Sequence, residues 1–279
     1  MLRIALLPWF VPRQHSLGKA LMELINDHLA VKARMVPPND NGYILLAAEV
    51  EWRGPFLPSR RTKRELLGRL KGRCEELATR EDVEEATLFR AVLVAPGEGV
   101  QLTRERGVRR ARYDVVVLVR TATVADAESL VSDPIYRGLS ETVAEAAKYT
   151  HEVVARNAVR LGDVDHRPNH AFLFNYFYAD DSETLLPVFE YTAGWFQAKT
   201  GLANSTLLRP LDTDAAYGII NHASWPSMRT FLPHLILRPS FRSFVLANFK
   251  ANGIAAQPII YRRVAEDPAA LYRHRLWSA

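Results

Sequence analysis

Cysteine is almost absent from this chain, which has a single thiol, Cys74, among 279 residues. One cysteine excludes an internal disulfide and any zinc site built on paired cysteines. Cys74 lies in a stretch with helical spacing, and the sequence shows no neighbouring base that would activate it. We therefore expect a helix thiol without a chemical role.

Long apolar runs are missing too, since none approaches the roughly 20 residues that a transmembrane helix needs. Residues 4–11 resemble the core of a secretion signal, but Pro8 interrupts them and no small-residue cleavage site follows. We expect a retained N-terminal segment, no membrane span and a cytoplasmic protein.

The common sequence signatures of enzymes are also lacking. There is no phosphate loop of the Gly-x-x-x-x-Gly-Lys type, no Gly-x-Gly-x-x-Gly after a strand and no Gly-x-Ser-x-Gly. His166 and His170 are separated by Pro168, which keeps them from sharing a helix face. Residues 162–170 are therefore interpreted as a solvated linker, and no metal site is expected.

The charge of the chain does not point to a particular class of function. The formal net charge is +5 and the isoelectric point about 9.4. Basic residues gather at 60–64, 104–112 and 273–275, without the interleaved aromatic residues that stack on bases. We expect solvated loops and no nucleic-acid partner.

What is present is an ordinary globular composition, 48% hydrophobic and 24% charged, in which strands and helices alternate. After an N-terminal helix capped by Ser16, the first half reads strand, helix, strand, strand, helix, strand. The predicted segments are 43–50, 61–80, 86–94, 113–121, 124–151 (broken near Pro134) and 153–161. The same order recurs at 171–179, 182–200, 205–211, 216–224, 226–252 and 257–264.

Three short matches, in the same order in both halves, indicate an internal repeat. Residues 86–90 match 205–209, Tyr113 matches Tyr217, and 134–137 match 239–242. The first copy carries extra residues at 96–112, which are expected to form a surface loop because insertions there cost little.

The strand and helix order of each copy is that of a ferredoxin-like unit, an antiparallel sheet with helices on one face. The predicted fold class is therefore α+β, with two tandem ferredoxin-like repeats covering each other's bare sheet as a pseudo-dimer within the chain. We expect an N-terminal extension with a helix at 1–40, repeats at 41–162 and 170–264, and a basic tail at 265–279.

The second half resembles the antibiotic biosynthesis monooxygenase-like family of dimeric α/β-barrel proteins. The motifs that carry the resemblance are 172–177, 192–195, 200–202, 206–209 and 219–231. Residues 113–116 and 133–136 carry it more weakly in the first half. Two chains normally pair in that family, so the resemblance supports pairing of the two repeats here, and a further homodimer stays open.

Asn175 is the leading candidate for a functional residue, because it is a lone amide in an apolar and aromatic strand. A buried amide without a partner costs about 1–3 kcal/mol, so protein, water or a ligand must satisfy it. The resemblance implies that Asn175 lines the pocket. Residues 43–48 offer no polar equivalent, so the second repeat is expected to carry the site alone.

Three further candidates lie on or just after the third strand of the second repeat. Asn221 and His222 point to opposite faces, since side chains alternate along a strand. Either could orient a substrate or take a proton, and one of them should face the core between the repeats. Trp225 would stack on the substrate ring or anchor the helix start.

Phe177 and His234 complete the expected substrate-binding set. In haem-degrading members, the resemblance implies an iron-binding His on a helix, near Arg242 and Ser243 of this chain, where no His exists. We therefore expect no cofactor, and haem in particular is not favoured.

The resemblance implies a monooxygenase-like function, the cofactor-independent oxidation of an aromatic or polyketide-like small molecule in the cavity between the repeats. Asn175, Asn221 and His222 would be catalytic. The alternative is a non-catalytic small-molecule-binding or scaffold protein of the same fold, and a haem-binding module is the third hypothesis. Whether the protein is an enzyme stays open at this point.

Overall fold

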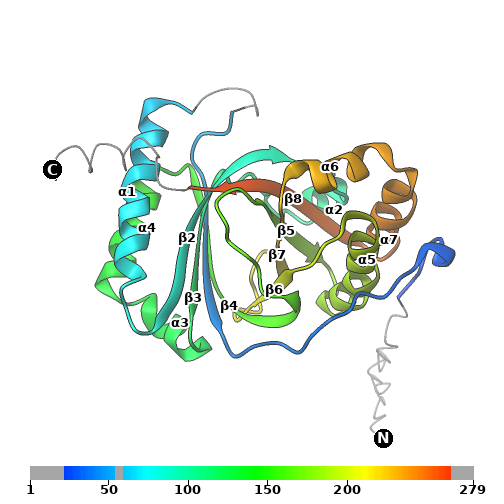
Figure 1. Ribbon diagram of the computed structural model, residues 1–279, viewed down its shortest axis with the longest axis horizontal. Helices are drawn as coiled ribbons and strands as arrows, with labels where there is room; N and C mark the ends of the chain where they lie inside the picture. The colour runs from blue at the N-terminus through cyan, green and yellow to red at the C-terminus, as the bar shows by residue number, and fades with distance from the viewer. Residues whose placement is uncertain (1–21, 54–58, 265–279) are drawn as a thin grey trace, which may run out of the picture.

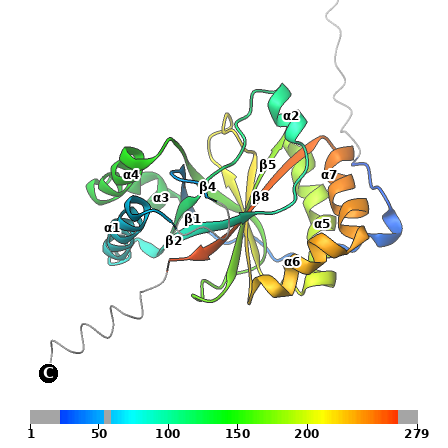
Figure 2. The same cartoon turned by 90° about the horizontal axis from the view of Figure 1, so that it is seen from above.

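The computed structural model describes residues 22–53 and 59–264. The apolar segment at 4–11, the start of the predicted N-terminal helix and the basic tail lie outside this part of the chain. Eight strands close into one barrel, and helices cover it on two opposite sides (Figures 1 and 2).

Each repeat contributes four strands and its own helices. After the short 3-10 helix η1 (Asp27–Leu29), the first repeat contains β1 (Gly42–Glu49), α1 (Arg61–Leu77), β2 (Val83–Val94), α2 (Val100–Glu105), β3 (Val115–Thr121), α3 (Val124–Leu130), α4 (Pro134–Ala146) and β4 (Tyr149–Gly162). The second contains β5 (Ala171–Ala179), η2 (Ser182–Thr184), α5 (Leu185–Thr200), β6 (Ser205–Pro210), β7 (Ile219–Trp225), α6 (Met228–Leu237), the π-helical η3 (Phe241–Leu246), α7 (Ala247–Ala251) and β8 (Ile254–Arg263).

The strand order around the barrel is β1-β3-β2-β8-β5-β7-β6-β4, and every pairing is antiparallel. The second strand of each repeat pairs with the last strand of the other, β2 with β8 and β6 with β4. The closed barrel therefore leaves no sheet edge to water. This topology confirms the predicted α+β pseudo-dimer of two ferredoxin-like repeats.

Residues matched in the sequence repeat occupy equivalent places. Tyr113 and Tyr217 meet inside the barrel, with their hydroxyl oxygens 3.1 Å apart. Tyr136 and Phe241 are both buried, each in the helical layer of its own repeat. The pseudo-twofold relation between the halves is thus visible in individual side chains.

Aromatic rings fill the barrel interior. Phe89 of β2 makes edge-on contacts with Phe172 and Phe174 of β5 at centroid distances of 5.0 and 5.3 Å. At the other end Tyr113 packs on Tyr176 at 5.0 Å. The space between the two repeats, where a substrate cavity was expected, is therefore a packed core in the described part of the chain.

Two segments differ from their sequence-based prediction. The described part of the N-terminal helix, from residue 22 on, contains only η1, and residues 96–112 hold α2 instead of a free loop. This insertion is tied to β8 by two backbone hydrogen bonds between Glu98 and Ala256, and by the Ala111 N–H, which donates to Gln257 Oε1 at 2.7 Å. Such long-range pairing cannot be read from local pattern.

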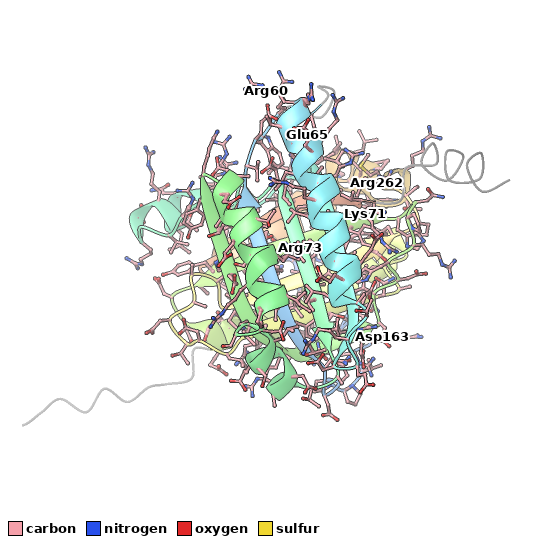
Figure 3. All side chains as sticks on the ribbon, turned by 90° about the vertical axis from the view of Figure 1, so that its left-hand side faces the viewer. Arg60, Glu65, Lys71, Arg73, Asp163 and Arg262 are labelled. Atoms are coloured by element: carbon pink, nitrogen blue, oxygen red, sulfur yellow. The ribbon has the colours of Figure 1, made fainter. Side chains whose placement is uncertain are left out.

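The helical layer of the first repeat is tightly packed on its sheet. Figure 3 shows α1 and α4 from outside, with Arg60, Glu65, Lys71 and Arg73 on the outward surface. Leucines on the opposite side of these helices, among them Leu66, Leu70 and Leu139, are buried against β1 and β3.

A chain of hydrogen bonds through His166 links both repeats. His166 Nδ1 lies 2.7 Å from Glu85 Oε1 on β2, and its Nε2 lies 2.8 Å from His222 Nε2 on β7. His222 Nδ1 donates to the Leu173 carbonyl at 3.1 Å, because that oxygen can only accept. His222 Nε2 is then the acceptor, so His166 donates to it from Nε2.

The surroundings agree with this proton arrangement. Burial alone would raise the pKa of Glu85, but the hydrogen bond and charge of His166, the hydrogen bond of Thr87 and the charge of Arg120 together lower that pKa to about 2. Burial, reinforced by His166, holds the pKa of His222 well below its ordinary value. His166, whose side chain is only 10% exposed, therefore belongs to a network and not to a solvated linker.

We predict that Glu85→Gln lowers the free energy of unfolding at pH 7 by on the order of 2 kcal/mol. A carboxyl with a depressed pKa stabilises the fold above its unfolded pKa near 4.5, and that contribution is lost as the pH falls towards 2. Denaturant unfolding at several pH values should show the two proteins converging between pH 4.5 and 2. Glu84→Gln, at the half-exposed neighbour, is the control, and equal slopes for all three proteins would contradict the prediction.

The N-terminal segment crosses α5 at a glycine. The Ala33 N–H donates to the Glu190 carbonyl at 2.9 Å, and a Cβ added to Gly194 would lie 1.7 Å from the Val31 carbonyl oxygen. The backbone of the N-terminal segment approaches α5 so closely at this point that only glycine fits.

Gly194→Ala should therefore destabilise the protein by roughly 1–3 kcal/mol, because the crossing backbone must move. Gly72→Ala on α1, where an added Cβ meets nothing within 4 Å, should stabilise it by about 0.5–1 kcal/mol through helix propensity. Thermal unfolding of both variants measures the difference. The close approach would be disproved by two variants that shift the melting temperature in the same direction.

Candidate functional site

Helices α5, α6 and α7 cover the outer face of the second repeat's sheet (Figure 2). An apolar pocket lies between that face and the layer of α5, α6, η3 and α7. Alternate residues of β5, β7 and β8 point into it, while the intervening residues face the barrel interior. Residues 95–97, where β2 runs into the α2 insertion, complete the wall. The first repeat thus contributes to the pocket of the second.

Asn175 of β5 lines this pocket and is 8% exposed. Its Oδ1 is buried without a hydrogen-bond partner, and none of the described residues bonds to any atom of its side chain. Buried polar groups in folded proteins are nearly always paired, so an orphan of this kind requires an explanation. A ligand that brings a hydrogen-bond donor into the pocket would supply one.

Asn221 of β7 stands directly opposite Asn175 in the strand register. Its Oδ1 accepts a hydrogen bond of 2.5 Å from the hydroxyl of Ser205, which is fully buried on β6. The oxygen is thereby occupied, and the NH2 group is left as the free donor of this side chain. The two amides therefore lie side by side in the pocket wall, Asn175 with an unpaired oxygen and Asn221 with an unpaired NH2 group.

The corresponding pair in the first repeat is apolar. The repeat offset given by Tyr113 and Tyr217, 217 − 113 = 104, places Asn221 opposite Val117 in the alignment. Val117 pairs with Leu46 on β1, just as Asn221 pairs with Asn175 on β5. The amide pair is thus a property of the second repeat alone.

Phe177 and Trp225 also line the pocket, so four of the six predicted site residues come together there. Trp225 donates its indole N–H to Thr200 Oγ1 at 3.0 Å and stacks on Phe231 at a centroid distance of 4.4 Å. Trp225 therefore both anchors the helical layer and offers part of its ring to the pocket.

The other two predicted residues lie elsewhere. His222 points into the barrel interior, stacked on Phe174 at 4.1 Å and bonded to His166. His234 is on α6 outside the pocket lining, and its Nδ1 accepts from Arg238 Nε at 2.6 Å. The structure therefore does not bring either imidazole to the amide pair, and the roles suggested for them remain predictions.

Sequence reasoning missed Ser205 and the insertion. Side chains alternate between the two faces of a strand, and Ser205 of β6 lies on the same face of the sheet as Asn221. The strand pattern could therefore have predicted that Ser205 points towards the amide. No sequence pattern predicted that Gly97 lies in the pocket wall. A Cβ at that position would lie 2.2 Å from the Ala256 carbonyl oxygen, a contact that the neighbouring Glu98–Ala256 bridge creates.

A second, smaller cleft opens at one end of the barrel, beside His166 and His222, with Tyr43 and Thr206 in its wall. Among the residues that the structure describes, no three His, Cys, Asp or Glu side chains are grouped as metal ligands. Within residues 22–53 and 59–264, no helix combines the length and apolar character that crossing a bilayer requires.

Neither a known family model nor a curated protein sequence matches this chain. Solved structures do match in fold. An anthrone oxidase-like protein is 11% identical over 85% of this chain and 97% of its own, with a TM-score of 0.53. A protein from Fusobacterium nucleatum, named as a candidate monooxygenase, is 6% identical over 81% and 94%, with a TM-score of 0.52. Identities this low establish the fold alone.

The expectation that this protein has no cofactor is contradicted. Similar structures include a candidate chlorite dismutase and a dye-decolorizing protein from V. cholerae, with TM-scores of 0.47 and 0.45, and both belong to haem-binding classes. The apolar pocket of this chain is lined by no imidazole, thiol or phenol that could bind a haem iron. No haem contact is therefore assigned to its residues.

The barrel order, the antiparallel pairing and these matches lead to one conclusion. The chain has the dimeric α/β-barrel fold of monooxygenase-like proteins, with both halves of the barrel supplied by two ferredoxin-like repeats of a single polypeptide.

Proposed function

We propose that this protein binds a phenolic small molecule in the apolar pocket of its second repeat and oxidises it with dioxygen. The observation that carries the proposal is Asn175, a buried amide whose oxygen has no partner and which lies in a wall of aromatic and aliphatic side chains. Pockets that are mostly apolar, with a few converging polar groups, are typical of small-molecule sites. The fold likeness to an anthrone oxidase-like protein suggests the reaction class.

The overall reaction balances for the conversion of a phenol to a quinone. A ring C–H is replaced by C=O, the phenolic O–H becomes the second C=O, and the other oxygen atom of O2 leaves as water with the two hydrogens. Electrons pass from the ring to dioxygen, so the ring is oxidised and oxygen is reduced.

The amide pair would act on the phenolic oxygen. Asn175 Oδ1 accepts the hydroxyl hydrogen and orients the ring, while the Asn221 NH2 group donates to the same oxygen or its neighbour. The hydroxyl proton is lost to water as an acidic phenol enters, and the Asn221 NH2 group, a fixed donor in an apolar pocket, stabilises the negative charge on that oxygen. Ser205 would act through Asn221 as a positioning residue.

The pocket lining contains no titratable side chain that could serve as a general base. An amide oxygen does not hold a proton at neutral pH, so the reaction favours phenols that are themselves acidic. The same observation favours the second candidate function, a binding protein that holds the molecule without converting it.

We predict that Asn175→Leu lowers kcat/KM for phenol oxidation about 100-fold, the usual effect of removing one polar group from such a site. Oxygen uptake and quinone absorbance, measured over one-, two- and three-ring phenols, report the activity. Asn169→Leu is the matched control, because Asn169 is exposed in the linker and its side chain makes no hydrogen bond within the described residues.

If Asn175→Leu takes up oxygen at the same rate as the unmodified protein, the pocket does not take part in the reaction. Saturable binding without oxygen uptake in the unmodified protein would establish the binding-protein alternative. Circular dichroism of each variant would separate loss of activity from loss of fold.

A further inference from the structure

We propose that a groove beside β2 is the docking site of the chain's own C-terminal tail, with residues 265–267 extending β8 along the part of β2 that β8 leaves uncovered. β2 has 12 residues, but its described pairing with β8 ends at Phe89. The Val264 N–H then donates to the Leu88 carbonyl at 2.8 Å, at the last described residue. The chain therefore leaves β8 in line with the uncovered side of β2.

The groove lies where such an extension would run. It is lined by residues 86–88 of β2, by Pro168 and Asn169 of the linker, by α1 and by Val264 itself. Its volume is about 450 Å³, so it can hold a short stretch of extended chain. Addition of a strand beside an uncovered strand is a common way for proteins to bind a peptide segment, because main-chain hydrogen bonds supply the affinity.

The second repeat shows the same arrangement with this position filled. Ser205 matches Ala86 in the sequence repeat, and its strand β6 pairs with β4. That pairing continues as far as Gly162, which lies opposite Ser205 at the start of β6. By the pseudo-twofold relation between the repeats, the partner of Ala86 has to come from the residues that follow Val264.

The register identifies that partner as Glu266. Arg263 pairs with Phe89, and three further residues of the same antiparallel register place Glu266 opposite Ala86. Backbone groups alternate between the two sides of a strand, so those of Ala86 point to the same side as those of Leu88. Ala86 and Glu266 would then exchange two backbone hydrogen bonds, each N–H donating to the other carbonyl.

The side chains of the tail suit this position. Val264 packs against the apolar core beneath α1, and Glu266, two residues later, would face the same helix. Lys71 of α1 lines the groove there, so a carboxylate would meet an ammonium group. Pro268 has no N–H to donate, so the ladder would end after residue 267.

The test compares the full chain with a chain truncated after Val264. Hydrogen exchange resolved by residue should show the Ala86 amide exchanging about tenfold faster without the tail, because its hydrogen bond is lost. The Thr87 amide points towards β3 and should not change, which makes it the internal control for an intact fold. Cys74, the one thiol of the chain, lines the same groove, so its reaction with 5,5′-dithiobis(2-nitrobenzoate) should also be faster without the tail.

Two proline variants of the full chain test the register. Glu266→Pro removes the N–H that would donate to Ala86, so the Ala86 amide should exchange as fast as in the truncated chain. Ala265→Pro is the matched control, because its N–H would point away from β2, and it should keep the Ala86 amide protected. A synthetic peptide of residues 265–279, added to the truncated chain, should restore the protection.

Equal exchange of the Ala86 amide in the full and truncated chains would overturn the proposal. Equal effects of the two proline variants would overturn it as well, because they would refute the register. Protection that rises with protein concentration would assign the groove to a second copy of the chain instead of to its own tail.

Discussion

The structure depends on one constraint: a ferredoxin-like sheet has helices on one face only, and its other apolar face must be covered. Here each repeat covers the other, and the cross-pairing of β2 with β8 and of β4 with β6 closes the two sheets into a barrel. Aromatic side chains from both repeats then fill the interior. That interior is packed, and the apolar pocket lies instead between the sheet of the second repeat and its own helices.

The two helical layers are not equivalent, and this asymmetry makes one of them a candidate site. In the first repeat Leu46 and Val117 pack beneath α1 and α4 in an apolar core. In the second, Asn175 and Asn221 take the same places, beneath a layer that includes the π-helical η3. Irregular helices of that type occur often at functional sites. Both halves thus share the scaffold, and only the second carries the amide pair.

The segment that connects the repeats also makes specific contacts with both of them. His166 hydrogen-bonds to Glu85 of the first repeat and to His222 of the second, so the linker joins the two halves by a chain of hydrogen bonds. The α2 insertion also joins the two halves, because it belongs to the first repeat and its backbone pairs with β8 of the second. The pocket wall at Gly97 therefore depends on correct assembly of both halves.

Local pattern in the sequence determined the strands, most helices, the internal repeat and the position of Asn175 as a lone amide in an apolar strand, since these follow from alternation and helical spacing along the chain. Alternation also predicted that Asn221 and His222 would face opposite sides. The tertiary structure alone decided which side holds the pocket, because packing of rings from both repeats closes the barrel interior. It also decided that Ser205 holds Asn221, that His166 meets His222, and that the 96–112 insertion is part of the wall. Each of these contacts joins residues distant in the chain, and no local spacing encodes the distance between them.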